Sequence, residues 1–215
     1  MPSGLACCGI PALASGDADS FKKMAAYNLD ILGKLEFDYV VTACASCTET
    51  IEQFWPRYAE GAQKATAEKI SAKTLDISAF LVDVIGLEKP AQARVGAEGG
   101  RREKVTYHDS CHLAKSLGVR RQPRELVKAN PECELIEMRE PDTCCGCGGS
   151  FTLTHYDISK KIGGRKRENI VASGADTVAC GCPACMMQIS NMLALNGDEV
   201  KVKHVAELYA DSLDK

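Results

Sequence analysis

The sequence predicts an α/β fold made of two similar units in tandem, and three observations carry that prediction. Two segments each open with Cys-Cys-Gly, at residues 7–9 and 144–146, and each reaches a Cys-x-x-Cys pair about 35 residues later. Between the two motifs, each segment contains a helical pattern followed by a short β-rich run. Chance does not produce a match of this length and order, so we interpret the chain as a duplication of one α/β unit. The pairs are Cys44 with Cys47, and Cys182 with Cys185.

The elements of the first unit follow from the apolar pattern. Phe21, Met24, Ala25, Leu29 and Leu32 recur at helical spacing. The run DYVVTA that follows is typical of a strand, and it ends at the first cysteine of the pair. The predicted elements are a helix over 20–35, a strand over 38–43, a helical stretch over 48–55 and a segment over 73–84 that resembles residues 201–212.

A segment rich in glycine, alanine and charge, residues 88–104, separates the first unit (1–87) from the second (105–215). The second unit then repeats the order of the first, with Gly174 marking the end of its longest helix. Its predicted elements are strands over 104–111, 134–138 and 176–181, helices over 122–130 and 155–173, and a helical stretch over 186–195.

The second unit begins with a strand that ends at Cys111, about 30 residues before its Cys-Cys-Gly. The first unit has no counterpart, because Cys7 lies too close to the first residue. We therefore expect the first unit to be truncated at its N-terminus and to lack one ligand. A shortened chain, a misplaced start or a piece of a longer polypeptide would each account for this.

Composition excludes several classes of protein. The chain has 215 residues, 45% hydrophobic and 26% charged, with a net charge of −3 and no basic stripe interleaved with aromatics, so nucleic-acid binding is not expected. The sequence contains no run of about 18 apolar residues that could span a bilayer, and its N-terminus lacks the pattern of a signal peptide.

Twelve cysteines without an export signal indicate metal ligands or redox thiols in a reducing compartment, which predicts a cytoplasmic protein. No dinucleotide fingerprint or hydrolase triad is visible.

Each cysteine of the repeat falls where a strand gives way to a loop, and such strand ends line a common crevice in parallel sheets. Five thiolates exceed the four ligands that zinc needs, whereas polynuclear iron–sulfur clusters use thiolates as their usual ligands. Iron–sulfur binding is therefore the prediction, with zinc, a redox disulfide or plain buried thiols as alternatives. The candidate ligands are Cys111, Cys144, Cys145, Cys182 and Cys185 in the second unit, and Cys7, Cys8, Cys44 and Cys47 in the first.

Other residues that could carry chemistry have simpler interpretations. Cys133 is predicted to be a buried structural thiol. Cys147 and Cys180 lie two residues from ligands and are predicted to be non-ligands, with spare ligands or thiols that contact the ligands as the alternative. His108 and His112 bracket Cys111. Each could donate to a cluster sulfur, take a proton at a redox site, or be satisfied by backbone groups. The remaining predictions are a helix cap at His155 and core positions for Met186, Met187 and Met192.

The spaced cysteines resemble the CCG cysteine-rich domain. That domain occurs in tandem in one subunit of the heterodisulfide reductases and in iron–sulfur subunits of glycolate oxidase, anaerobic glycerol-3-phosphate dehydrogenase and the lactate-utilisation system. The stretches YHDSCHLAKSLGVRRQPRELV and CCGCGGSFTLTHYDISKKI are most similar to the lactate-utilisation proteins. GCPACMMQIS resembles the C-terminal end of longer fused iron–sulfur proteins. The resemblance implies two Rossmann-like units related by a pseudo-two-fold axis.

The resemblance also implies a function. The cysteines of each unit would hold a noncubane [4Fe-4S] cluster, complete in the second unit and in doubt in the first. The chain would transfer electrons within a multi-subunit oxidoreductase that oxidises lactate or a similar 2-hydroxy acid. Ferredoxin-like and flavin- or substrate-binding partners would complete it, with any membrane association made through them, and the basic run GRKR (164–167) is a candidate docking face. The alternatives are a subunit that cleaves a disulfide at the cluster, and a zinc-bound structural module.

Overall fold

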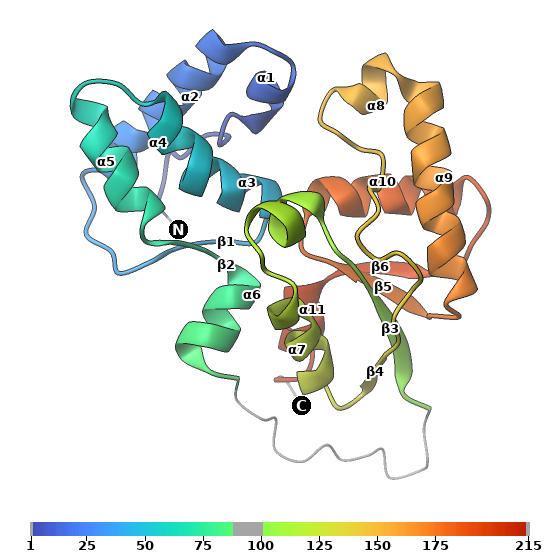
Figure 1. Ribbon diagram of the computed structural model, residues 1–215. Coiled ribbons are helices and arrows are strands. Elements are labelled where there is room, and N and C mark those ends of the chain that lie inside the picture. The colour runs from blue at the N-terminus through green and yellow to red at the C-terminus, as the bar shows by residue number, and fades with distance from the viewer. Residues whose placement is uncertain (1, 88–100, 214–215) are drawn as a thin grey trace.

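The computed structural model describes residues 2–87 and 101–213 (Figure 1). Its two halves meet along one boundary, and all of their sheet pairings are parallel. Most of the segment predicted as a linker lies outside the described residues, and β3 already begins at Glu103. The predicted α/β class with parallel strands is confirmed.

The first half is mainly helical around a two-stranded parallel sheet, in which Val40 of β1 pairs with Thr74 of β2. Helix α2 (Ala18–Leu32) is capped by Asp17, whose carboxylate accepts from the Ser20 N–H, and it buries one face. Met24, predicted on that face, is partly exposed. The elements are α1 (Ile10–Ala14), α2 (Ala18–Leu32), β1 (Val40–Thr42), α3 (Ala45–Glu49), π-helix η1 (Thr50–Phe54), α4 (Trp55–Tyr58), α5 (Ala62–Ser71), β2 (Thr74–Asp76), α6 (Ile77–Ala79) and π-helix η2 (Phe80–Ile85).

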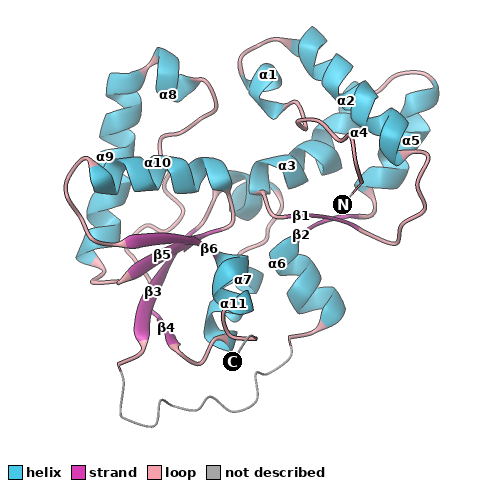
Figure 2. Cartoon of the chain, turned by 180° about the vertical axis from the view of Figure 1, so that it is seen from behind, coloured by secondary structure: helices cyan, strands magenta, loops and turns pink. Residues whose placement is uncertain are grey.

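The second half contains a four-stranded parallel sheet in the order β4-β3-β5-β6. Helices α9 and α10 pack on one side of this sheet, and α7 and α11 lie on the other (Figure 2). The elements are β3 (Glu103–His108), π-helix η3 (His112–Ser116), α7 (Arg121–Ala129), β4 (Cys133–Leu135), α8 (Phe151–Thr154), α9 (Tyr156–Ala172), β5 (Thr177–Cys180), α10 (Pro183–Ala194), β6 (Lys201–His204) and α11 (Val205–Ala210).

Matching backbone geometry supports the predicted duplication. The residue before α3, Cys44, has φ −148° and ψ 109°, and the residue before α10, Cys182, has φ −141° and ψ 113°. Likewise Asp76 and His204 end the strands β2 and β6, and each side chain caps the following helix. Strands β1 and β2 therefore correspond to β5 and β6, and the described part of the first half contains no counterpart of β3 and β4.

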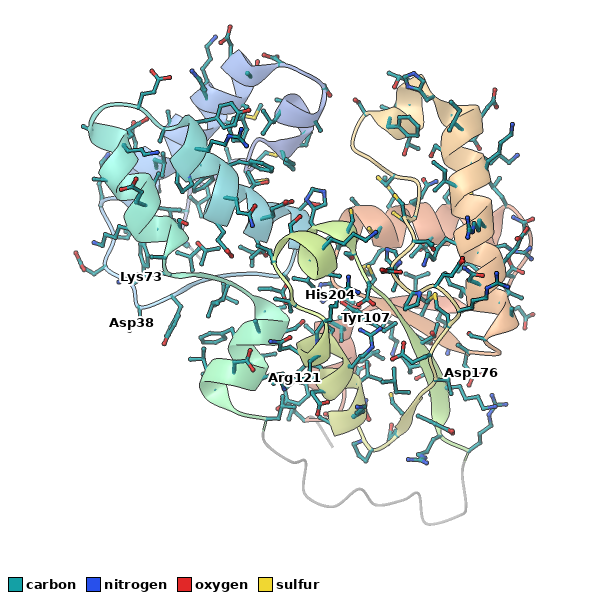
Figure 3. The ribbon with its side chains drawn as sticks, viewed as in Figure 1. Asp38, Lys73, Tyr107, Arg121, Asp176 and His204 are labelled. Carbon is teal, nitrogen blue, oxygen red and sulfur yellow. The ribbon has the colours of Figure 1, made fainter. Side chains whose placement is uncertain are left out.

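The halves share buried residues along their boundary. Ala45 of α3 belongs to the same core cluster as the cysteines of the second half. The N–H of Ala45 donates to the Gly181 carbonyl at 3.0 Å, which joins the two loops that follow β1 and β5. Tyr107 of β3 and His204 lie near this boundary, toward the middle of the molecule (Figure 3). The loops that carry the cysteine pairs thus meet at one place.

The strands predicted over 38–43, 104–111, 134–138 and 176–181 are all shorter than expected. Strand β3 ends at His108, and Cys111 instead precedes the π-helix η3. The strand stops there because the Asp109 N–H donates to the Pro141 carbonyl at 3.0 Å and not to a strand. Strand β4 ends at Leu135, although the Ile136 N–H still donates to Val105.

Candidate metal centre

The two Cys-Cys-Gly loops share one geometry. Gly9 and Gly146 have left-handed φ values of 95° and 91°. A Cβ at Gly146 would lie 2.6 Å from the Ser159 carbonyl oxygen, so this loop passes too close to α9 for any side chain. In both loops the glycine N–H donates to the thiol two residues earlier, at 3.5 Å for Cys7 and 3.3 Å for Cys144. Glycine is therefore required by both the backbone and the close approach.

Buried polar side chains anchor the first of these loops. The amide of Asn28 donates to the Cys7 carbonyl at 3.0 Å and accepts from the Ala6 N–H at 2.9 Å. The indole N–H of Trp55 donates to the Cys8 carbonyl at 2.9 Å. Asn28 and Trp55 are both fully buried, so the loop is held from inside the first half.

A buried ammonium anchors the second loop. Lys166 is 1% exposed, and its Nζ donates to the carbonyls of Glu140 at 2.8 Å and Pro141 at 3.1 Å. Among the described residues it forms no ion pair, and burial lowers its pKa to about 8. The thiols of Cys144 and Cys145 are among the groups whose charges act on it. The structure thus places a positive charge beside the second cysteine set.

The run GRKR, a candidate docking face in the sequence, is only partly at the surface, because Lys166 is buried while Arg165 remains 63% exposed. Arg165 pairs with Glu140, and Arg167 pairs with Asp198. Since Lys166 is buried beneath the loop, every cation of the run has a partner within the chain. The run therefore supports the second half, and its docking role stays a prediction.

In the second half the structure brings four of the five predicted ligands into direct contact. Cys145, Cys182 and Cys185 are buried, and the thiol of Cys185 contacts the other two. Cys144 is exposed and contacts Cys145, whereas Cys111 is half-buried and lies within electrostatic range of Cys145 and Cys182. The five sulfurs therefore form a buried core of three with two members at its outer side.

Thiol–thiol contacts shift the protonation of this set. Hydrogen bonds from Cys185 and Cys44 lower the pKa of Cys182 to about 2, and those from Cys144 and Cys185 lower the pKa of Cys145 well below its usual range. Cys182 occupies the N-cap position of α10, where the positive end of the helix also favours thiolate. Contacts with Cys145, Cys180 and Cys182 instead raise the pKa of Cys185, which lies in the first turn. Deprotonated sulfur is the form that binds metal.

The four cysteines of the first half form a row in which neighbouring thiols contact one another. Buried Cys8 contacts Cys47, which contacts Cys44, and Cys7 is exposed at the end of the row. Hydrogen bonding with Cys47 lowers the pKa of Cys8 to about 6. All four predicted first-unit ligands are therefore brought together.

This row continues across the boundary into the cysteine set of the second half. The thiols of Cys44 and Cys182 contact each other, and the Ser46 hydroxyl lies 3.6 Å from the Cys182 sulfur. The Ala45–Gly181 backbone hydrogen bond holds the two loops in this position. The two predicted metal sites therefore border each other at Cys44 and Cys182.

The histidines that flank Cys111 differ in their surroundings. His112 pairs through Nδ1 with Glu49 of the first half, so a carboxylate satisfies it, not the backbone. His108 is fully buried, and both of its ring nitrogens lack a hydrogen-bond partner in the described part of the chain. His155 does precede α9, but its side chain bonds Thr154 and does not cap the helix.

The structure adds two donors that the cysteine motif does not contain. Nitrogen of His108 and sulfur of Cys180 and Cys185 all lie within 4.8 Å of one another. The sequence carries a signal for this, because His108 and Cys180 end two neighbouring strands and pair in register. Without the strand order, that signal could not be interpreted.

The remaining sulfur residues are mostly buried. Cys133 is buried at the start of β4, as predicted, and Cys147 is buried close to the second set. Met192 is buried and Met186 half-buried, but Met187 is 61% exposed, so its assignment to the core is wrong.

Comparison with known proteins identifies the family. The model of the cysteine-rich domain CCG matches residues 1–52 and 105–190, together more than half of the chain. The chain belongs to the CCG cysteine-rich domain family. Both matched segments contain a Cys-Cys-Gly loop and at least part of the strand-end cysteines that form the row described above.

Individual relatives support an iron–sulfur group at this centre. The chain is 33% identical over 211 residues to the B chain of the fumarate reductase (CoM/CoB) from Methanothermobacter marburgensis, covering 97% of this chain and 39% of that protein. It is 31% identical to lactate utilization protein A 1 from Bacillus mycoides, covering 97% of this chain and 82% of that protein. An uncharacterized iron–sulfur protein from Methanococcus maripaludis is 32% identical to this chain over 194 residues, and the match covers 35% of that protein.

The Cys-Cys-Gly geometry predicts unequal costs for two glycine substitutions. Gly146→Ala adds a clash with Ser159 to the strain of a left-handed backbone, so we expect it to lower the free energy of unfolding by about 3 kcal/mol or more. Gly174→Ala has the same kind of backbone but nothing within 4 Å of the new Cβ, and should cost only about 1–2 kcal/mol. Urea denaturation of the metal-free variants measures both. Equal losses of unfolding free energy in the two variants would contradict the close approach of Gly146 to α9.

Proposed function

We propose that this chain binds iron–sulfur clusters and transfers electrons within a multi-subunit oxidoreductase. The observation that carries the proposal is the continuous row of cysteines, in which Cys44 and Cys182 meet across the boundary. Metal bound to the two halves would be separated by little more than these two side chains. Such a row suits electron transfer, because it links the two halves through closely spaced sulfurs.

The proposed ligands are those of the five-cysteine pattern. The proposed group is a [4Fe-4S] cluster of the noncubane type. It would supply one-electron chemistry that no side chain of the chain offers. The second-unit ligands are Cys111, Cys144, Cys145, Cys182 and Cys185, and those of the first unit are Cys7, Cys8, Cys44 and Cys47. The protein's own part is to orient these thiols, to bury four of them (Cys8, Cys145, Cys182 and Cys185) and to keep the positive charge of Lys166 beside the second-unit set.

We further propose that residues 1–87 and 105–215 are two Rossmann-like units related by a pseudo-two-fold axis. The matched loops at Gly9 and Gly146 and the matched cap geometry at Cys44 and Cys182 support this symmetry. The border at Cys44 and Cys182 is where such an axis would pass.

The substrate of the complex is proposed to be lactate or a similar 2-hydroxy acid, since relatives from several organisms are named lactate utilization protein A. Its oxidation would take place on flavin- or substrate-binding partners, and ferredoxin-like partners would relay the electrons. Free thiols at all twelve cysteines suit a reducing compartment such as the cytoplasm. None of the described helices is both long and apolar enough to cross a bilayer.

Disulfide reduction at the cluster is a second candidate function. The exposure of Cys7 and Cys144, one at each end of the cysteine row, favours it, because a disulfide could approach the centre from solvent there. The similarity to a reductase named for CoM and CoB agrees with this candidate. Turnover of a heterodisulfide with a low-potential donor would distinguish it from electron transfer alone.

Metal content tests the proposed function. We expect the anaerobically purified chain to contain at least about four iron and four sulfide, as one [4Fe-4S] cluster requires. Cys145→Ser should lose most of the iron of the second half, whereas Cys133→Ser, a buried thiol outside the centre, should keep it. One zinc without sulfide would refute electron transfer and leave a structural module.

The buried ammonium predicts a change in reduction potential. Lys166→Met removes a positive charge that favours the reduced, more negative centre, so its potential should become more negative at pH 7. Because the pKa of Lys166 is lowered to about 8, its charge is present below that pH and lost above it. The difference from wild type should therefore shrink as the pH rises past about 8. Redox titration monitored by electron paramagnetic resonance (EPR) measures this, with exposed Lys160→Met as the control.

A further inference from the structure

A second group of metal-binding atoms lies at the buried side of the second cysteine set. His108, Cys180 and Cys185 each offer one donor atom, and the three atoms lie within 4.8 Å of one another. Transition metals bind imidazole nitrogen at about 2.0–2.1 Å and thiolate sulfur at about 2.3 Å, so donors to one ion lie no more than about 4.6 Å apart. The three atoms are therefore close to the spacing that a single metal ion requires.

The imidazole of His108 lies against the sulfur of Cys145, whose pKa it helps to lower, but it forms no hydrogen bond of good geometry with any described residue. Its side chain is 1% exposed, and neither Nδ1 nor Nε2 has a hydrogen-bond partner. Leaving a buried polar group unsatisfied costs about 1–3 kcal/mol, so such groups are rare without a ligand. By contrast, His112, His155 and His204 each bond a side chain or a backbone N–H. A bound metal would satisfy a ring nitrogen of His108, which no described residue does with good hydrogen-bond geometry.

Backbone pairing fixes this histidine beside Cys180. The two residues end β3 and β5 and are partners in the parallel register. Cys180 is fully buried, its thiol contacts that of Cys185, and the Ser110 hydroxyl lies 3.3 Å from its sulfur. Neither residue is placed by a flexible loop, so their separation from Cys185 is set by the sheet and by the start of α10.

We propose that His108 and Cys180 bind iron together with Cys185, so that the second-unit centre has a mixed imidazole and thiolate ligand set. This inference rests on the proposed function, because it concerns the same centre. Binding would release the thiol proton of Cys180 and use the lone pair of one ring nitrogen. A neutral imidazole adds no negative charge, so a centre with this ligand has a higher potential than one bound by thiolates alone.

Isotope labelling tests the nitrogen ligand without any substitution. The full chain is loaded anaerobically with ferrous iron and sulfide, reduced, and examined by pulsed EPR with natural-abundance and ¹⁵N-labelled histidine. We expect a nitrogen coupling that changes with the label. His108→Leu should abolish this coupling, and His155→Gln, a substitution at an exposed histidine, should retain it.

Three further variants test the two added ligands. Cys180→Ala should lower the iron content and Cys133→Ala should not, because both thiols are buried but only Cys180 is near the centre. Circular dichroism of the metal-free variants shows that each has folded. His108→Cys should keep the iron and make the potential more negative, since a thiolate replaces the imidazole.

The outcomes separate this inference from the proposed function. A chain that binds iron and sulfide but whose spectrum is unchanged by ¹⁵N-histidine refutes imidazole ligation and leaves the electron-transfer function intact. A coupling that survives in His108→Leu also refutes it, because the nitrogen then belongs to another histidine. A chain that takes up neither iron nor sulfide refutes both.

Discussion

The hydrogen bond from the Ala45 N–H to the Gly181 carbonyl is the contact on which the centre depends, because it joins the two cysteine-bearing loops. Each loop follows a parallel strand and leads into a helix whose N-cap position is a cysteine. Fixing the loops together fixes Cys44 against Cys182. Since parallel strands end at a common edge, all the other donors of the second half collect at the same place. One backbone contact thus turns two repeated motifs into one continuous site.

The Cys-Cys-Gly loops are held by groups that do not depend on metal. Asn28 and Trp55 anchor the first loop, and Lys166 anchors the second, all through backbone carbonyls. Burying several thiolates without a counter-charge would be costly, and a positively charged metal offsets that cost. The protein therefore prepares the site by fixing backbone, and it leaves the main charge compensation to the metal, with Lys166 adding to it.

The sequence alone predicts the duplication, the parallel α/β class and the clustering of cysteines at strand ends, because these depend on short-range motifs. It does not predict His108 and Cys180 as neighbours, since this requires knowing that β3 lies next to β5. The strand before Cys111 is predicted too long because Asp109 turns toward Pro141, a contact with a distant loop. The basic run at 164–167 looks like a surface in sequence, and only the fold shows that Lys166 points inward.

Anomalous diffraction at the iron edge from anaerobically grown crystals tests the central claim most directly, since it locates each iron relative to the cysteines. The account predicts iron enclosed by Cys145, Cys182 and Cys185, on the side of the second half that borders Cys44. Iron bound away from this boundary, or a zinc signal in place of iron, would contradict it.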